Sequence, residues 1–329
     1  MQLLTPREAQ DLWPLMVVDD AVGAAFLPTD GQANPSDIPL SLAKGARMAG
    51  ALIYEDTKVT RIDVDKGVIK GIETSQGYIS CGVVIACCGQ WTRDFARCFG
   101  VNVPLVSVEH QYMVTEPIAG VSPDMPTLRD PDRLTYYKEE VGGLVMGGSE
   151  PNPIMWAKKG LPKGFHCQLL ESSFDHFEPI MEQALGRVPA LQTAGVKMLT
   201  NGPESFTPDG NFILGEAPEL KNFYVGAGFN AYGIAAGGGA GMALAEWVAN
   251  AGPPYDLWAV DIRRFGRPHF DTDWVRARTY KAYGKHYTMA RPAEEHDSGC
   301  PCRKSPLYER LKADGAVFGE KLGWERPNL

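Results

Sequence analysis

The sequence lacks the features that mark several classes of protein. It has no block of lysine and arginine, and its net charge of −8 argues against nucleic acid or an anionic membrane surface as a general partner. Its N-terminus has no basic segment followed by an apolar core, so no secretory signal is predicted. The apolar stretch near residue 240 is interrupted by Glu246 and Asn250 and is too short to span a membrane. We therefore expect a small molecule as the ligand.

The seven cysteines lack any recognisable pairing pattern. They are odd in number and mostly lie in apolar sequence, which is typical of buried thiols in a reducing compartment. Cys300-Pro301-Cys302 lacks the two-residue spacer and the second ligand pair of a zinc site. We predict neither disulfides nor a metal site, and we expect the protein in the cytoplasm of a bacterium or the mitochondrial matrix of a eukaryote.

Residue patterns predict alternating helices and strands in the first hundred residues. Thr5-Pro6-Arg7-Glu8 is a capping box with proline at the first helical position. We predict helices at 6–13, 36–47 and 92–99, and strands at 52–54, 58–64, 68–74 and 78–87. The three strands from residue 58 form an antiparallel meander that delivers a final buried strand.

A second pattern begins at Val103, where apolar and polar residues alternate. Strands are predicted at 103–115, 134–140 and 144–149, the last two joined by a hairpin turn at Val141-Gly142-Gly143. An amphipathic helix at 173–187 follows, with Ser173 as its cap. The simplest account is a separate antiparallel sheet. The aromatic and arginine-rich residues after Gly252 have little periodicity and indicate a connecting arm.

Residues 207–248 combine a strand, a glycine-rich turn and a helix. Phe223-Tyr224-Val225 is predicted to be a buried strand, and Met242, Leu244, Ala245 and Val248 the packed face of the helix. Seven glycines lie between Gly226 and Gly241 and let the backbone approach a planar group closely. The positive end of the helix would stabilise negative charge on a reduced flavin. The same glycines would also allow close helix packing, since Gly237 and Gly241 lie one turn apart.

Several segments together resemble the sarcosine and dimethylglycine dehydrogenase family, within the D-amino-acid-oxidase-like superfamily. They are GARMAGALIYEDTKVTRI, VVIACCGQW, VEHQYMVTEP, GPESFTPDGNFILGEAPEL, GFNAYGIAAGGGAG and, near the end, DIRRF and SPLYERLKADGAVFGEKLGWERP. The resemblance covers nearly the whole chain, and the segments occur in the family's order. It implies an α/β (α+β) fold in which a Rossmann-like FAD-binding domain carries an inserted antiparallel substrate domain.

The resemblance also implies a division of the chain. We expect the first part of the FAD-binding domain at 1–102, the substrate domain at 103–205, the return to the FAD-binding domain at 206–251 and a connecting arm at 252–329. The family's opening G-x-G-x-x-G turn, which seats the dinucleotide pyrophosphate, has no counterpart before Thr5. The histidine that holds FAD covalently in many members lies in the same unmatched region. The final GWERPNL resembles the entry to a folate-binding domain, so we expect a fragment that would use tetrahydrofolate only in a full-length form.

His110 and Tyr136 are the predicted catalytic residues. Strand alternation places His110 on the side of Val106, Val108, Tyr112 and Val114, where a histidine is either a core residue or a site residue. The His-Gln-Tyr step matches a histidine in the family's active site, which favours the second alternative. The family pattern likewise favours Tyr136 over Tyr137.

Eight residues match positions that hold the cofactor in the family. They are Val59 near the adenine, Gly89 and Trp91 beneath the flavin nucleotide, and Gly228, Asn230, Tyr232, Gly233 and Ile234 in the turn beside the isoalloxazine. Arg263 and Arg264 are candidate anchors for a substrate carboxylate, but we expect them to be structural residues of the arm.

The implied reaction is oxidative N-demethylation of a small N-methyl amino acid, sarcosine or dimethylglycine. Hydride leaves the N-methyl carbon for flavin N5 only from the neutral amine, so the site must favour that form by desolvation, with His110 as proton acceptor or orienting group. The electron acceptor would be oxygen or an electron-transfer flavoprotein. Two alternatives remain: a non-catalytic regulatory protein resembling the regulatory subunit of pyruvate dehydrogenase phosphatase, and another amine oxidase such as a methylaminobutyrate oxidase.

Overall fold

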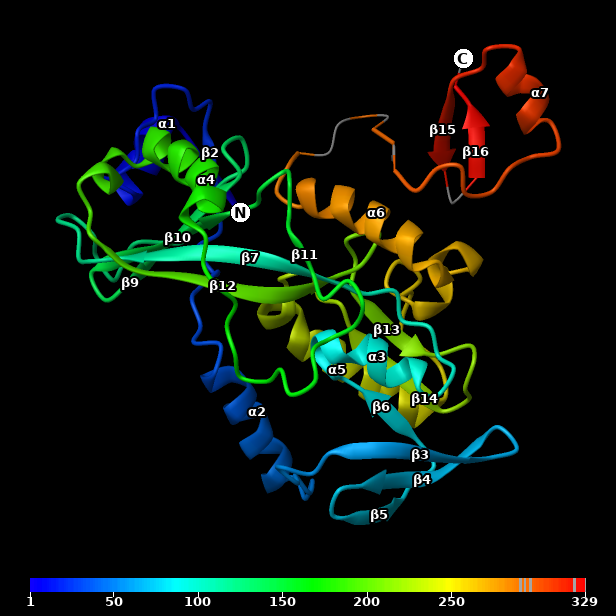
Figure 1. Cartoon of the computed structure of the whole chain (residues 1–329). Coiled ribbons are helices and arrows are strands. Elements are labelled where there is room, and N and C mark those ends of the chain that lie inside the picture. The colour runs from blue at the N-terminus through cyan, green and yellow to red at the C-terminus, as the bar shows by residue number, and fades with distance from the viewer. Residues whose placement is uncertain (290–291, 293, 296–297, 322–323, 329) are drawn as a thin grey trace.

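A six-stranded antiparallel sheet forms the centre of the molecule (Figure 1). The computed structural model describes residues 1–289, 292, 294–295, 298–321 and 324–328. The strand order is β11-β7-β10-β9-β8. Strands β10 and β11 pair with different parts of one edge of β7, and β12 pairs with its other edge. Its strands are β7 (Val106–Thr115), β8 (Leu128–Asp130), β9 (Thr135–Glu140), β10 (Gly143–Gly148), β11 (Met155–Trp156) and β12 (Val196–Phe206). The separate antiparallel sheet predicted from residue 103 is therefore present, although β8, β11 and β12 were not predicted.

The β9–β10 hairpin shows how local sequence sets the register of this sheet. Val141 and Gly142 at its tip have φ angles of 51° and 80°. Two consecutive residues with positive φ are the signature of a type I′ turn, whose twist matches that of the flanking strands. The turn aligns Tyr136 with Gly147.

Helices cover one face of this sheet. Helix α4 (Phe174–Arg187) is capped by Ser173, whose hydroxyl accepts a hydrogen bond from the His176 N–H at 3.2 Å, as predicted. It packs with α1 (Pro6–Leu12) over a core that contains Met113, Tyr137, Leu144 and Met146. The N-terminal residues also form the short pair β1 (Gln2–Leu4) and β2 (Ala24–Phe26). Other elements contact the opposite face of the sheet.

A smaller sheet lies beneath the first in Figure 1 and has the order β13-β14-β6. Its strands are β6 (Val84–Ala86), β13 (Ile213–Glu216) and β14 (Phe223–Ala227). Strands β6 and β14 are parallel, and β14 is fully buried, as expected for Phe223-Tyr224-Val225. Helices α3 (Thr92–Arg97) and α5 (Gly233–Asn250) follow β6 and β14. Two strand-turn-helix units therefore lie side by side.

Two strand predictions were wrong. The predicted strand 78–87 is two strands, since Cys81 to Val83 break it and β5 (Gly77–Ser80) stays with β3 (Val59–Asp65) and β4 (Val68–Thr74) in a separate meander. Leu52, Ile53 and Tyr54 form no strand, and their exposed fractions are 78%, 40% and 62%. Among the described residues no strand pairs with them, and an apolar run without a neighbour cannot satisfy its backbone as a strand.

Helix α5 buries only part of the predicted face: Leu244 is buried and Val248 packs against the same core. Ala240, Ala243, Leu244 and Trp247 face the core, whereas Met242 and Ala245 are exposed. Trp247 packs where Gly215 leaves space, because a Cβ on Gly215 would lie 2.6 Å from its ring. A Cβ on Gly237 or Gly241 would meet no atom within 4 Å, so these glycines do not serve close helix packing within the described residues.

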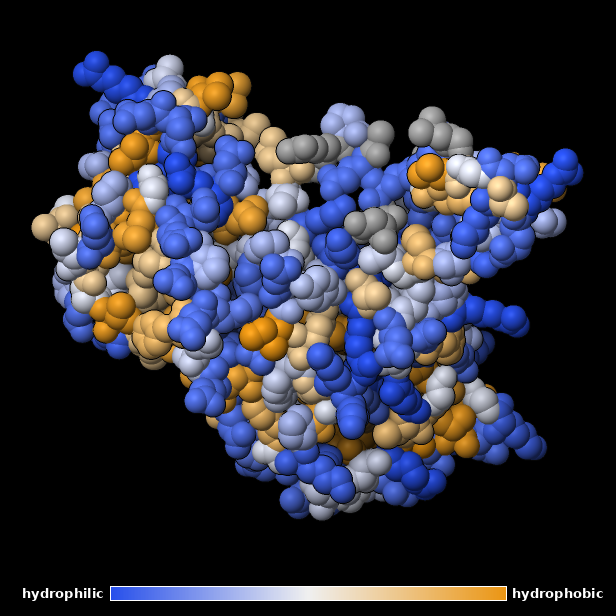
Figure 2. Space-filling model, turned by 45° about the horizontal axis from the view of Figure 1, so that its top comes forward, coloured by the Kyte–Doolittle hydropathy of each residue, from blue (hydrophilic) through white to orange (hydrophobic). Residues whose placement is uncertain are grey.

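The remaining elements are peripheral or belong to the arm. Helix α2 (Asp37–Met48) has no buried residue. The arm contains α6 (Thr272–Gly284), α7 (Tyr308–Ala313) and the strand pair β15 (Phe318–Lys321) and β16 (Trp324–Pro327). On the face shown in Figure 2, hydrophobic residues lie scattered among hydrophilic ones. In the described part of the chain, every helix is too short or too polar to cross a membrane.

The cysteines differ from their predicted environment. All seven lie among the described residues, and none of them forms a disulfide there. None is fully buried, however, and Cys87, Cys98, Cys167 and Cys300 are exposed.

Candidate active site

His110 lies on β7 on the sheet face opposite α4. Gly202 of β12 is its direct cross-strand partner. Both ring nitrogens have hydrogen-bond partners: Nδ1 lies 2.9 Å from the hydroxyl of Tyr283, and Nε2 lies 3.3 Å from the hydroxyl of Tyr136. The structure thus brings together the two residues that the sequence predicts to be catalytic.

Tyr136 reaches His110 because one residue between them has no side chain. Gly147 of β10 pairs with Tyr136 on one side and with Tyr112 on the other. A Cβ on Gly147 would lie 2.3 Å from the Tyr136 hydroxyl and 2.5 Å from its ring carbon Cζ. The tyrosine ring therefore lies across Gly147. Tyr137 points to the other face, where its ring centroid is 5.7 Å from that of Trp13.

Three further residues of the site come from the arm and were not predicted. Tyr283 ends α6, and its carbonyl accepts a hydrogen bond from the Ser149 hydroxyl at 3.3 Å. Tyr287 stacks on Tyr136 at 6.0 Å between centroids, and His286 packs against Tyr232 at 4.9 Å. The only sequence signal was a cluster of aromatic residues in a segment without periodicity.

Burial keeps the aromatic groups of this site neutral. It raises the pKa of the Tyr136 phenol well above the usual value, and Tyr287 adds to the effect. Burial, followed by the charge of Glu150, also raises the pKa of Tyr283 well above its usual value. Burial raises the pKa of Tyr287 to about 12, and burial together with Arg129 lowers the pKa of His286 to about 4. At neutral pH these groups therefore donate and accept hydrogen bonds without carrying charge.

A cavity of about 330 Å³ opens beside His110. Its lining includes Trp91, His110, Tyr112, Phe165, Gly202 and Glu204. Trp91 stacks against Phe165, with ring centroids 6.5 Å apart. Two lining residues carry buried oxygens, Thr200 Oγ1 and Glu204 Oε2, that have no hydrogen-bond partner among the residues the structure describes. The cavity thus combines apolar walls with polar atoms able to bind a ligand.

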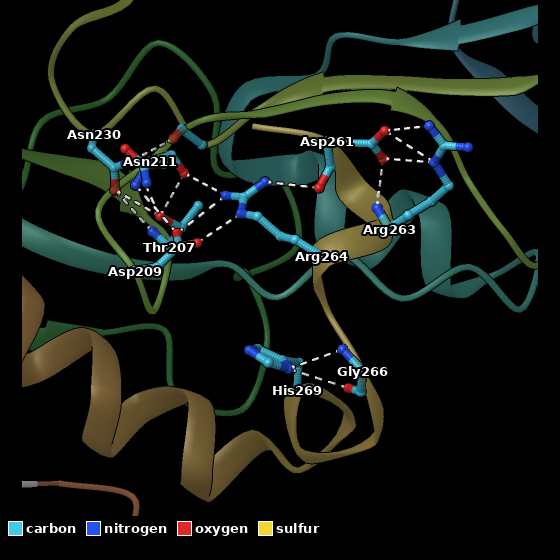
Figure 3. A network of polar contacts seen from close by, with 10 residues as sticks. Thr207, Asp209, Asn211, Asn230, Asp261, Arg263, Arg264, Gly266 and His269 are labelled. Atoms are coloured by element: carbon cyan, nitrogen blue, oxygen red, sulfur yellow. Dashed lines mark hydrogen bonds and ion pairs between the residues drawn. The ribbon is translucent and has the colours of Figure 1, made fainter. Parts of the chain in front are cut away.

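Hydrogen bonds of the Asn230 side chain fix the conformation of the glycine-rich turn before α5. Asn230 accepts a hydrogen bond from the Thr207 N–H at 2.9 Å and donates one to the Gly228 carbonyl at 2.6 Å (Figure 3). Gly228 has a φ angle of 65°, and a Cβ there would lie 2.6 Å from Leu105. Within the described part of the chain, no side chain caps the N-terminus of α5, where Tyr232 and Ile234 are 42% and 51% exposed. Asn230 therefore shapes the turn, and the first N–H groups of α5, beginning at Gly233, remain available to a ligand.

The other predicted cofactor residues lie in two parts of the fold. Trp91 lines the cavity, and Gly89, with a φ angle of 55°, begins the short helical turn Gly89–Trp91 before α3. Val59 begins β3 in the meander, at the lower end of the molecule in Figure 1, and does not line the cavity.

Arg263 and Arg264 are structural, as expected. Figure 3 shows the Arg263 guanidinium bound to Asp261, with Nη2–Oδ2 at 2.5 Å. Arg264 binds Asp209, with Nε–Oδ2 at 2.6 Å, and also the carbonyl of Asn211. These bonds join the arm to the loop before β13.

Comparison with known families agrees with this architecture. Residues 1–247 match the model of the family described as FAD dependent oxidoreductase, and residues 252–305 match the FAD dependent oxidoreductase central domain. The chain belongs to the FAD dependent oxidoreductase family. The Rossmann-like fold class and the FAD cofactor expected from the sequence are those of this family.

Individual relatives of this FAD dependent oxidoreductase share nearly the whole chain. It is 40% identical to mouse sarcosine dehydrogenase and 39% identical to 4-methylaminobutanoate oxidase (formaldehyde-forming) of Paenarthrobacter nicotinovorans. It is 36% identical to the mouse pyruvate dehydrogenase phosphatase regulatory subunit. Each alignment covers 99% of the chain but only 36%, 39% and 37% of the respective relatives. The chain therefore spans little more than a third of these relatives.

Solved structures show the same fold. L-proline dehydrogenase from P. horikoshii is 25% identical in sequence and superposes with a TM-score of 0.70, covering 80% of this chain and 68% of that one.

The residues around α5 fit the redox end of FAD. The uncapped N-terminus of α5 supplies N–H donors and positive charge, and the glycines behind it leave space on the exposed helix face. Gly228, Tyr232, Gly233 and Ile234 would hold this end, and Trp91 would lie on the cavity side.

Proposed function

We propose that this protein uses FAD to oxidise a small N-methyl amino acid. The observation that carries the proposal is the His110–Tyr136 pair, which lies beside a largely apolar cavity on the sheet face opposite α4. Bound FAD would supply the two-electron acceptor for the hydride that leaves the N-methyl carbon.

The residues of the site favour the form of the amine that reacts. A substrate nitrogen in the cavity would lose much of its hydration between Trp91, Phe165 and Tyr112, which disfavours the ammonium form. His110 would accept the proton, and the Tyr136 hydroxyl, kept neutral by burial, would hold the imidazole in place. The unpartnered oxygen of Glu204 offers an acceptor for an N–H group.

The relatives support the substrate class. Sarcosine and 4-methylaminobutanoate appear in the names of two of them, and dimethylglycine in the name of human dimethylglycine dehydrogenase, which is 32% identical over 99% of this chain and 38% of its own length. All three compounds are N-methylated amino acids. We infer sarcosine or dimethylglycine as the substrate, and 4-methylaminobutanoate as the alternative. We also infer a cytoplasmic location in a bacterium or a mitochondrial one in a eukaryote.

An anaerobic titration of the FAD-loaded protein tests the proposal. Sarcosine, dimethylglycine and 4-methylaminobutanoate are added separately, and the flavin absorbance is followed. Loss of absorbance with one of them supports the proposal and selects the substrate. A protein that binds FAD but is reduced by none of the three is not an N-methyl amino acid oxidoreductase, and the regulatory alternative would then be favoured.

A further inference from the structure

His110 is the inner end of a continuous chain of hydrogen-bonded side chains. Its Nδ1 lies 2.9 Å from Tyr283 Oη, which donates to Glu150 Oε2 at 3.1 Å. The other oxygen, Oε1, lies 3.0 Å from Nε2 of His176. Four side chains from β7, α6, the end of β10 and α4 are thus joined in order.

Burial decreases toward the outer end of this chain. Tyr283 is 1% exposed and Glu150 5%, whereas the His176 side chain is 21% exposed. His176 is fixed in the first turn of α4 by the Ser173 cap.

The hydrogen positions in this chain follow from its donors. Tyr283 has one hydroxyl hydrogen and gives it to Glu150, so His110 must donate its Nδ1–H to the Tyr283 oxygen. The Nε2 of neutral His110 is then an acceptor and receives the Tyr136 hydroxyl hydrogen. His110 is therefore held with its acceptor nitrogen toward Tyr136 and its donor nitrogen toward the chain.

We propose that His110, Tyr283, Glu150 and His176 form a proton relay that carries the proton of the substrate amine away from the site. This inference rests on the proposed amine oxidation. The N–H bond of the ammonium breaks as an O–H bond forms on Tyr136, and the original Tyr136 hydroxyl hydrogen passes to Nε2 of His110. The Nδ1 hydrogen passes to Tyr283, and the Tyr283 hydrogen passes to Glu150, so the proton ends on a carboxyl group and no electrons are exchanged. His176, one hydrogen bond further on, is reached by water.

The charged and titratable groups around His110 are consistent with proton movement from His110 toward Glu150. His110 faces Tyr136 from β9, Tyr283 and His286 from the arm, and Glu204 from β12. Burial keeps Tyr283 a neutral phenol by raising its pKa, so it conducts a proton by exchange and does not store one. Glu150 is the first carboxylate along the chain and so the first group that can take up the hydrogen from Tyr283.

Two substitutions break the relay while leaving His110 in place. Tyr283→Phe removes the conducting hydroxyl, and Glu150→Gln removes the acceptor. In the FAD-loaded chain, anaerobic flavin reduction by sarcosine should slow at least about tenfold at neutral pH in both variants. It should also acquire a solvent deuterium isotope effect that the parent protein lacks, and recover as pH rises. Tyr224→Phe and Glu216→Gln, in the smaller sheet, are matched controls that should retain parental rates.

A second measurement does not depend on flavin reduction. Nitrogen-15 NMR of histidine-labelled protein should show His110 as the Nδ1–H tautomer in the parent and lose that preference in Tyr283→Phe. Parental rates with no isotope effect in both variants, or unchanged His110 signals in Tyr283→Phe, would overturn the relay. Absence of reduction in the parent protein would instead refute the proposed function, and the NMR result would still decide whether the chain orders His110.

Discussion

The absence of a side chain at Gly147 should be as important to the site as Tyr136, whose ring lies across it. A Cβ at this position would lie 2.3 Å from the Tyr136 hydroxyl and 2.5 Å from Cζ. Both separations are far below van der Waals contact, so Gly147→Ala must move the ring off β10 and away from His110. Overpacking of this kind costs about 1–3 kcal/mol of unfolding free energy.

The kinetic effect can be bounded from the hydrogen bond that is lost. A neutral hydrogen bond contributes about 0.5–1.5 kcal/mol, which corresponds to roughly a two- to tenfold change in rate or affinity. We expect Gly147→Ala to lower kcat/KM for flavin reduction by about that factor, and Tyr136→Phe to lower it similarly. The assay is stopped-flow reduction of the FAD-loaded variants, with urea unfolding to measure stability.

Gly202→Ala is the matched control. Gly202 flanks the same stretch of β7 on its other edge, and a Cβ there would meet only Leu169, at 3.8 Å, which is ordinary contact. Its stability should change by less than about 0.5 kcal/mol. If Gly147→Ala is as stable as Gly202→Ala and as active as the parent protein, Tyr136 does not lie across Gly147 and the account of the site fails.

Three further predictions concern stability and cofactor binding. Arg187→Ala should cost up to about 3–5 kcal/mol in urea unfolding, because it removes the Nε–H that lies 2.6 Å from the buried Asp130 carboxylate and leaves Arg133, at 3.8 Å, as its basic partner. Adding Asp130→Asn should recover part of the loss. The pKa of His286 is about 4 in the folded state and about 6.5 in the unfolded state, so only the unfolded state gains a proton at this position as pH falls from 6.5 to 4. The free energy of unfolding should therefore drop by about 1–2 kcal/mol over this range, after allowance for solvent screening. The drop should be smaller in His286→Gln. Gly237→Ala should stabilise α5 by about 0.5–1 kcal/mol in the absence of FAD, because the added Cβ meets no described atom within 4 Å. The same substitution should weaken FAD binding, measured by fluorescence quenching. Unchanged binding would show that Gly237 does not contact the cofactor.

The sequence predicted the parts of the site that depend on local rules. Alternation along β7 placed His110 on the face opposite Met113, and the hairpin signal at Val141-Gly142 fixed the register that aligns Tyr136 with Gly147. It could not predict the contact between Tyr283 and His110, because the two residues are 173 positions apart and Tyr283 lies in a segment with no periodicity. It also misplaced the strand at Leu52 to Tyr54, because an apolar run becomes a strand only where another strand pairs with it.

Anaerobic reduction of the FAD-loaded protein by sarcosine or dimethylglycine, compared with His110→Asn, tests the central claim most directly. We predict that the parent protein is reduced, and that His110→Asn still binds FAD but is reduced at least about 100-fold more slowly. Equal rates in the two proteins, or no reduction of the parent by any N-methyl amino acid, would contradict the account.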